Sequence, residues 1–271
     1  MRAALRSPMF CSVEDWLERL ARNRFPSLDE LNELVGPQVK SGAGMPIVFV
    51  ETPSVPGEAY ESAIFRTGRV PTRAENWHDL FNALAWLSFP QTKAVLNRRH
   101  CEEMIRVDAR SGCRGTARDV LTLFDEGGVI VASSDRALLE MLRRFQWKSL
   151  FWEYRSQVRR CMRCFVFGHA ILEKALQPYK AVTARALLFQ VPECFPGRPL
   201  AEQLAEADRL AAQWFSGCDA LSSTRVLAPL PVLGVPGWAD NSTSSFYDDA
   251  EVFRPGYQGD HGKAGTVGSS P

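Results

Sequence analysis

Residues 75–89 predict a helix that must be enclosed by protein on opposite sides. At 100° per residue, its apolar side chains fall on two faces. The broad face carries Trp77, Leu80, Phe81, Leu84 and Leu87, and the other carries Trp86 and Phe89. A helix with apolar side chains on both sides is buried. The chain must therefore build a core around this helix, which indicates a globular protein.

The composition is that of an ordinary globular domain. Hydrophobic residues make up 45% of the 271 residues and charged residues 23%, which excludes global disorder, a collagen and a coiled-coil rod. Lys and Arg number 32 against 31 Asp and Glu, so the net charge is +1. This balance gives no global field that would mark a nucleic acid or an anionic membrane as the partner.

Signals for membranes, export and disulfides are missing from the sequence. No stretch reaches the roughly 18 apolar residues of a membrane span, and no apolar core of signal-peptide length follows Arg2 and Arg6. The seven cysteines are odd in number and scattered, unlike a secreted disulfide framework. We therefore expect a cytoplasmic protein with reduced thiols and no membrane partner.

The chain has one C-x-x-C pair, Cys161 and Cys164. A structural zinc site usually needs a second pair at matching spacing. Cys101, Cys113 or His169 could supply further ligands, but no regular spacing indicates that they do. A packing role for the two thiols is the favoured interpretation.

Capping and helix-breaking residues divide the chain into many helices and few strands. Two helices are expected to begin near Ser12 and Ser27, which precede acidic residues in capping-box-like patterns. Further helices are expected over residues 58–65, 76–89, 90–110, 116–126, 135–145, 147–177 with a break near Arg160, and 199–215. Strands are expected over residues 46–50, 129–132 and 186–191, and a loop over the proline-rich residues 229–238. The predicted class is α+β, predominantly helical with about three short strands.

The predicted domain organisation has three parts. Residues 1–44 form an N-terminal helical segment, and residues 45–255 form a single globular domain. From Pro255 onward, five of 17 residues are glycine and none is Leu, Ile or Phe. Such a segment cannot bury a core, so residues 256–271 are expected to be a disordered tail.

Several well-known catalytic motifs do not occur. The sequence contains no G-x-S-x-G, H-E-x-x-H, G-x-x-x-x-G-K or G-x-G-x-x-G. This excludes the standard α/β-hydrolases, zincins, P-loop NTPases and Rossmann dehydrogenases.

Two predicted helices carry polar residues where a core would favour aliphatic ones. In the first, Glu75, His78, Asp79 and Asn82 fall within one arc of about 100°. In the second, His169 and Glu173 share a face, being four residues apart. Their neighbours on that face are Phe165, Val166, Leu172 and Leu176. Burying such groups costs several kcal/mol unless they pair or bind a metal. The two clusters could meet, and their side chains would then pair with one another or bind a metal together.

The combined cluster offers the ligand types that zinc, manganese or iron take. We expect His78, Asp79 and His169 as ligands of a divalent metal. Glu173, and Asp79 when it is not a ligand, are the expected catalytic carboxylates, with Glu173 as the general base for a metal-bound water. Asn82, with Arg73 and Arg114 from flanking loops, is expected to bind an anionic group of the substrate.

Two interpretations without catalysis stay open for these residues. Buried His–Asp and His–Glu pairs often only satisfy each other and fix the packing, which would make the protein a scaffold with a structural polar network. The helix over residues 116–126 is an ordinary amphipathic helix with a solvated polar face. Asp125 and Glu126, at its end before a Gly-Gly turn, are the weaker site candidates.

A competing hypothesis concerns residues 143–163. This stretch has seven basic residues and one acidic residue, interleaved with aromatic ones. Basic and aromatic side chains together suit single-stranded nucleic acid, so RNA is the alternative partner. The structural interpretation is that the aromatic residues pack in the core and that Arg155, Arg159 and Arg163 form a solvated ridge.

Six separated segments together resemble a known family. They are residues 70–73, 76–97, 118–128, 165–174, 229–238 and 246–255, which include Val70-Pro-Thr-Arg73, Asn76-Trp-His-Asp79 and Phe165-Val-Phe-Gly-His-Ala170. On these residues the chain resembles the bacterial family catalogued as domain of unknown function 3025, over roughly residues 45 to 255. The resemblance implies a single bacterial domain and brings no activity, cofactor or catalytic residue.

The leading hypothesis is a cytosolic enzyme with a buried polar site that hydrolyses a small, anionic substrate with a divalent metal. The alternatives are a nucleic-acid or ribonucleoprotein binding module that uses residues 143–163, and the non-catalytic scaffold. Convergence of the His78 and His169 side chains is the observation on which the enzyme hypothesis depends.

Overall fold

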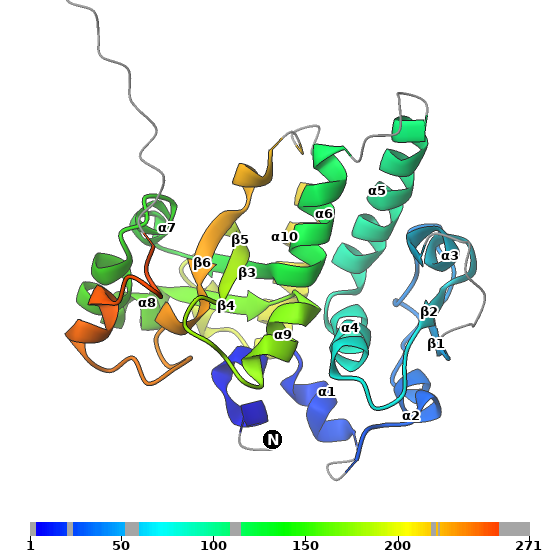
Figure 1. Ribbon diagram of the computed structural model, residues 1–271, viewed down its shortest axis with the longest axis horizontal. Helices are drawn as coiled ribbons and strands as arrows, with labels where there is room; N and C mark the ends of the chain where they lie inside the picture. Colours follow the sequence, from blue (N-terminus) through cyan, green and yellow to red (C-terminus); the bar gives the residue numbers. More distant parts are fainter. Residues whose placement is uncertain are drawn as a thin grey trace, which may run out of the picture.

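A four-stranded mixed sheet lies near the centre of the molecule, with helices on both of its faces (Figure 1). The computed structural model describes residues 4–20, 24–51, 60–108, 115–217, 221 and 223–254. Their α-helices are α1 (Glu14–Arg19), α2 (Leu28–Glu33), α3 (Tyr60–Thr67), α4 (Trp77–Ser88), α5 (Pro90–Asp108), α6 (Thr116–Gly127), α7 (Arg136–Arg143), α8 (Arg155–Cys161), α9 (His169–Ala175) and α10 (Leu200–Gly217). The strands are β1 (Val48–Val50), β2 (Arg69–Pro71), β3 (Gly128–Ser133), β4 (Met162–Val166), β5 (Thr183–Gln190) and β6 (Ala228–Pro231).

The predicted class, α+β and predominantly helical, is confirmed. The described residues contain six strands in two small sheets, where the sequence indicated about three. In the larger sheet the order is β4-β3-β5-β6, with β3 parallel to β5 and the two outer pairs antiparallel. The smaller sheet is the parallel pair β1-β2. It lies beside α3 at the edge of the molecule (Figure 1).

The central strand β3 separates two parts of the core. All six of its residues are buried, and successive side chains point to opposite faces. Val129 and Val131 belong to the part that includes residues of α4, α7 and α9. Ile130 and Ala132 belong to the part that includes residues of α6 and α10. The fully apolar run of β3 is therefore explained by burial on both faces.

The start signals of two helices are confirmed, and one is wrong. Ser27 forms a complete capping box with Glu30 at the start of α2, and the Asn76 side chain accepts from the backbone N–H of Asp79 at the start of α4. Ser12 does not cap α1. Its hydroxyl donates to the carbonyl of Val166 at 2.6 Å instead, because the N-terminal segment lies against β4.

Two predicted segments differ from the structure. The stretch 147–177 is broken near Arg160, as the sequence indicated, but the break contains a strand: a π-helical turn at residues 149–153 and α8 are followed by β4 and then α9. Strand β4, which pairs with β3, was not recognised in the sequence because basic residues surround it. Residues 229–238 are not all loop, since Ala228–Pro231 pairs with β5. Prolines are tolerated there because β6 is an edge strand.

The N-terminal residues share the core of the larger part of the chain. Phe10 is fully buried, and its ring lies 5.7 Å from that of Phe81 on α4, centroid to centroid. The predicted boundary at residues 44 and 45 stays a prediction, and the predicted tail of residues 256–271 lies outside the described residues. Within the part of the chain that the structure describes, no helix combines the length and the apolar character needed to cross a membrane.

Asp208 of α10 caps the start of α5 from outside that helix. Its buried carboxylate accepts the backbone N–H groups of Gln91 at 3.0 Å and Thr92 at 2.8 Å. The first N–H groups of a helix have no partner within the helix. This contact therefore joins α10 to α5, which forms one wall of the cavity described below.

Asp208→Ala is expected to destabilise the protein by about 2–4 kcal/mol, since it leaves buried N–H groups without an acceptor. Chemical denaturation measures this loss, and Asp208→Asn, which keeps one acceptor oxygen, should lose less.

The comparison of the wild type with Asp208→Asn also gives a prediction of how stability depends on pH. Burial raises the pKa of Asp208, although the hydrogen bonds from Thr92 and Gln91 oppose that shift. A folded pKa above the unfolded value means that the stability contribution is complete below the unfolded pKa of about 3.9 and is lost as the pH rises through the folded value. The stability advantage of the wild type over Asp208→Asn should therefore widen as the pH falls from 7 toward that value. A constant or shrinking difference would contradict the assignment.

Candidate metal centre

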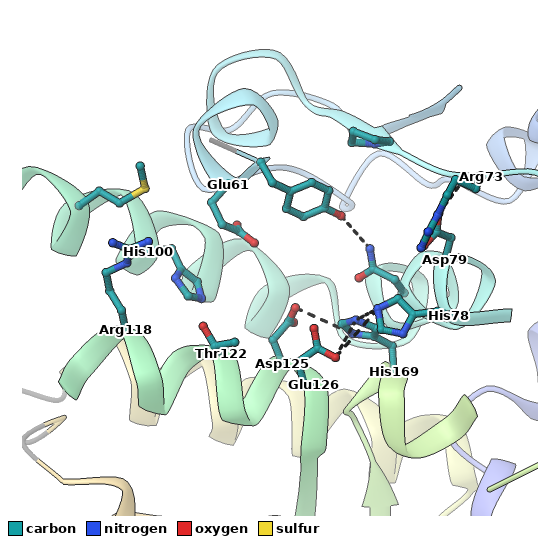
Figure 2. Close-up of a pocket in the computed structure, with 14 residues that line it drawn as sticks. Glu61, Arg73, His78, Asp79, His100, Arg118, Thr122, Asp125, Glu126 and His169 are labelled. Carbon is teal, nitrogen blue, oxygen red and sulfur yellow. Dashed lines mark hydrogen bonds and ion pairs between the residues drawn. The ribbon is translucent and has the colours of Figure 1, made fainter. Parts of the chain in front are cut away.

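A cavity of about 500 Å³ lies where α3, α4, α5, α6 and the start of α9 meet (Figure 2). Its volume is in the range of small-molecule sites. The lining residues are mostly polar or titratable: Tyr60, Glu61, Pro71, Arg73, His78, Asp79, Asn82, His100, Met104, Arg118, Thr122, Asp125, Glu126 and His169.

The backbone around Gly168 brings His169 beside Glu126. The N–H of Gly168 donates to the carbonyl of Gly128 at 2.9 Å, at the point where α6 passes into β3. A side chain at this position would lie 2.5 Å from the backbone of Glu126 and Gly128, so only glycine permits this approach. The next residue, His169, is the first of α9 and is buried. Its Nε2 lies 3.5 Å from Oε2 of Glu126.

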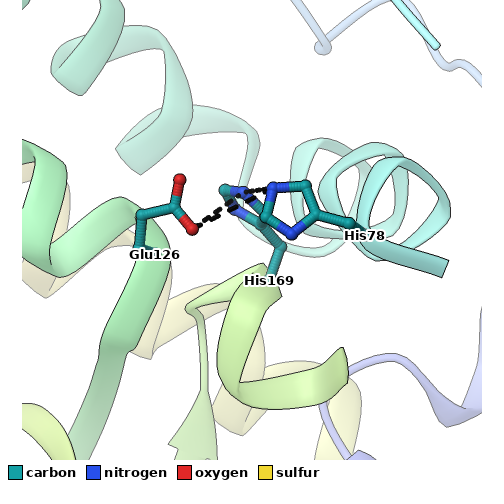
Figure 3. A group of neighbouring side chains, drawn as sticks. All are labelled: His78, Glu126 and His169. Carbon is teal, nitrogen blue, oxygen red and sulfur yellow. Dashed lines mark hydrogen bonds and ion pairs between the residues drawn. The ribbon is translucent and has the colours of Figure 1, made fainter. Parts of the chain in front are cut away.

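His78 comes from the first turn of α4 and completes a group of three (Figure 3). Its Nε2 lies 3.0 Å from Nε2 of His169 and 4.0 Å from Oε2 of Glu126. The expected convergence of the two imidazoles is thereby confirmed. Among the described residues, His78, Glu126 and His169 are the one group whose ligand atoms all lie within 4.8 Å of one another.

Each of the two histidines also faces a carboxylate with its other nitrogen. His78 Nδ1 lies 3.0 Å from Oε2 of Glu173, one turn further along α9 than His169. His169 Nδ1 is buried without a hydrogen-bond partner, and Oδ2 of Asp125 lies 3.9 Å away. A carboxylate behind each imidazole is the outer shell typical of metal-bound histidines.

Asp125 is held by Lys93, a buried residue of α5. Lys93 Nζ donates to Oδ1 of Asp125 at 2.6 Å and to Oδ1 of Asn82 at 2.9 Å, and it lies 5.2 Å from the centre of the Trp86 ring. The Asn82 amide in turn donates to the Tyr60 hydroxyl. Burial alone would raise the pKa of Asp125, but the attraction to Lys93 and His169 outweighs it and lowers that pKa. Asp125 is therefore ionised at neutral pH.

Two neutral imidazoles in this arrangement leave one of their nitrogens without a suitable partner in either tautomer of His169. Because Glu173 accepts from Nδ1 of His78, a neutral His78 has a lone pair on Nε2. If His169 carries its proton on Nδ1, toward Asp125, a second lone pair faces the first at 3.0 Å. If it carries the proton on Nε2, a bare buried Nδ1 faces the Asp125 carboxylate. A positive charge between the two Nε2 atoms and Glu126 removes this conflict.

The formal charge and the distances fit a divalent metal. With neutral imidazoles, the carboxylates of Asp125, Glu126 and Glu173 and the ammonium of Lys93 leave two negative charges. The neighbouring His169 lowers the pKa of Glu126, against the effect of burial. Ligands at about 2.0–2.2 Å around tetrahedral zinc lie about 3.3–3.6 Å apart. The observed separations of 3.0, 3.5 and 4.0 Å are close to this geometry.

The other predicted site residues have different surroundings. Asp79 forms a two-pronged pair with the guanidinium of Arg73, at 2.8 Å to each carboxylate oxygen, and accepts the Arg73 backbone N–H as well. Arg73 thereby lowers the pKa of Asp79, against the effect of burial. Both residues line the cavity. Asn82 is bound to Lys93 and Tyr60, and Arg114 lies outside the described residues.

The sequence interpretation gave Asp125 and Glu126 only as weaker site candidates, and it missed Lys93. The polar arc of α6 was taken for a solvated face, but the cavity covers its C-terminal part. The position of Asp125 and Glu126 directly before two glycines and a buried strand was the one signal that distinguished them. Lys93 gave no sequence signal, since lysine is ordinarily exposed.

Cys164 and several side chains of the basic stretch are buried or hydrogen-bonded within the protein, which indicates a structural role. Burial raises the pKa of Cys164 to about 12, so its thiol is unreactive at neutral pH. In residues 143–163, Trp147 and Phe151 are buried, and Arg155 donates to Asn241 and to the Tyr247 hydroxyl. These groups hold the C-terminal segment in place.

The fold and the cavity define an α+β protein with a candidate three-ligand metal centre. The model of the family described as a protein of unknown function (DUF3025) matches residues 47–257. The chain belongs to this family, as the sequence resemblance predicted. No curated protein and no solved structure matches the chain.

Proposed function

We propose that the protein is a metal-dependent hydrolase that binds a divalent transition metal, zinc in the first place, through His78, His169 and Glu126. The main observation in support of this proposal is that two imidazole Nε2 atoms and one carboxylate lie around a common point at the edge of the cavity. Two histidines and one glutamate form a ligand set of known catalytic zinc sites, in which the fourth position is left for water or substrate.

The metal would supply the nucleophile. Zinc lowers the pKa of a bound water to about 7 and polarises the bond under attack. Glu173 and Asp125 would orient the imidazoles through their Nδ1 atoms. Asp79, paired with Arg73, would shape the cavity wall. The predicted role of Glu173 as a general base is thus replaced, in this proposal, by an orienting role.

Metal content tests the proposal first. The full-length protein, stripped with a chelator, reconstituted with zinc and dialysed, should hold about one equivalent per chain. Glu126→Gln, which keeps the size of the side chain but loses the charge, should hold far less. A zinc content that stays well below stoichiometric after reconstitution would contradict the proposal.

Catalytic use of the metal needs a second measurement. The cobalt-loaded protein should have a visible spectrum that changes when azide is added, because azide takes the open coordination position. A panel of carboxylic, phosphomonoester and phosphodiester chromogenic substrates should reveal a hydrolysis that chelation abolishes and zinc restores. A stoichiometric metal whose spectrum does not respond to azide would indicate a closed, structural site, as the scaffold hypothesis requires.

The described contacts add no observation in favour of RNA binding through residues 143–163. That hypothesis stays a prediction from the sequence, as does a cytoplasmic location. Salt-sensitive RNA binding that is lost in a variant with Arg159→Ala and Arg160→Ala, both exposed, would support it.

A further inference from the structure

Arg118 is the cation of the cavity wall that has no acidic partner among the described residues. It lies in the first turn of α6, at the opposite end of the helix from Glu126, and Figure 2 shows it beside His100. The other two cations near the cavity are neutralised: Arg73 by Asp79 and Lys93 by Asp125.

The guanidinium of Arg118 is partly removed from water without compensation. Its Nε is buried and has no hydrogen-bond partner in the described part of the chain. A buried donor without an acceptor is costly, and more so when it carries charge. A partly buried guanidinium of this kind in a cavity wall is suited to bind an anion.

The surroundings of Arg118 contribute charge of both signs. The N-terminus of α6 has no side-chain cap, so the positive end of the helix dipole is not offset by a capping oxygen. Burial lowers the pKa of His100, so this neighbour is a neutral donor or acceptor. The carboxylate of Glu61, on the facing helix α3, accepts from the side-chain amide of Asn97 at 2.7 Å, but it keeps its negative charge and, like Asp125, offsets part of this potential at His100.

We propose that Arg118, with His100 beside it, forms a subsite for an oxyanion group of the substrate, either a carboxylate or a phosphate. Its assignment as a substrate subsite rests on the proposed function. Arg118 and Glu126 are eight residues apart on one helix, which corresponds to about 12 Å. The substrate is therefore an extended molecule that carries its anionic group about that far from the bond that is hydrolysed at the metal.

Anion binding to the metal-free protein tests this subsite separately from the metal. Inorganic phosphate and acetate are titrated in the presence of a chelator, and binding is followed by calorimetry and by the NMR signals of the arginine Nε–H groups. At least one of the two anions should bind saturably, and Arg118→Met should weaken that binding at least about tenfold. Arg118→Lys, which keeps the charge but not the two-pronged geometry, should lose less.

Arg69→Met is the control, since Arg69 is an exposed arginine of β2 that does not line the cavity. It should bind the anion as the wild type does. Binding of phosphate alone or of acetate alone supports the subsite and decides the anion class. The subsite is refuted if neither anion binds saturably, or if Arg118→Met binds as tightly as the wild type. Zinc content should be unchanged in Arg118→Met, so a failed metal test leaves this result interpretable.

Discussion

His169→Ala is expected to lower the zinc affinity several hundredfold. Structural zinc binding is worth about 10–16 kcal/mol shared among four ligands, so one ligand contributes about 3–4 kcal/mol. His169 should show the largest loss because it is buried, whereas His78 and Glu126 are partly exposed and a water can replace them more easily. Competition with a chromophoric chelator measures the affinities.

The outer carboxylates should give a graded response. Glu173→Gln keeps a polar group next to Nδ1 of His78 but removes the charge that fixes the tautomer. Loss of such an outer partner typically costs 10–100-fold in metal affinity. Its effect should therefore lie clearly between that of His169→Ala and that of the wild type.

His100→Ala is the control for this series. His100 is another buried histidine of the same cavity, but it lies outside the group of three. Its variant should keep the zinc affinity of the wild type. Equal losses in His100→Ala and His169→Ala would mean that the cavity as a whole, and not a ligand set, determines the zinc content. An unchanged zinc affinity in His169→Ala would contradict the proposed metal centre.

The inward-facing polar residues of two helices were the part of the site that the sequence could reveal. Periodicity placed His78 on a helix that is apolar on opposite sides and His169 within an apolar stripe, and the two imidazoles do meet at 3.0 Å. Such an inference works because burial of polar groups is costly, so their positions in a pattern carry information.

The third member of the group could not be recognised in the same way. Glu126 lies near the end of a helix whose pattern is that of an ordinary amphipathic surface helix, and its polar face lines the cavity because α5 and α9 pack against α6. The position of His169 beside Glu126 depends on the close approach of Gly168 to the backbone of Glu126, which is a contact between residues 42 positions apart. Asp79 illustrates the opposite case, since its pattern indicated a ligand but Arg73 is close enough to pair with it. Long-range packing decides the first outcome, whereas the second depends on a pairing between residues six positions apart.

Lys93→Met is expected to cause the largest loss of stability of any variant considered. The substitution keeps the length and apolar stem of the side chain but removes the ammonium that Asp125 and Asn82 share. Removing one partner of a buried ion pair costs about 3–5 kcal/mol, because the other charge stays behind without compensation. For a protein of this size, that loss corresponds to a fall in Tm of about 10 °C.

The double variant Lys93→Met with Asp125→Asn separates the charge from the packing. If the cost of Lys93→Met arises from the stranded Asp125 carboxylate, removal of that charge should restore a large part of the lost stability, which is a coupling of 0.5–3 kcal/mol for residues in contact. Chemical denaturation in the presence of a chelator measures this coupling without a contribution from bound metal. Additive losses in the double variant would contradict the pairing. Recovery of stability together with a lowered zinc affinity would instead mean that the Lys93–Asp125 pair is retained for the metal centre, since the same Asp125 carboxylate that destabilises the fold when it is unpaired also faces Nδ1 of His169.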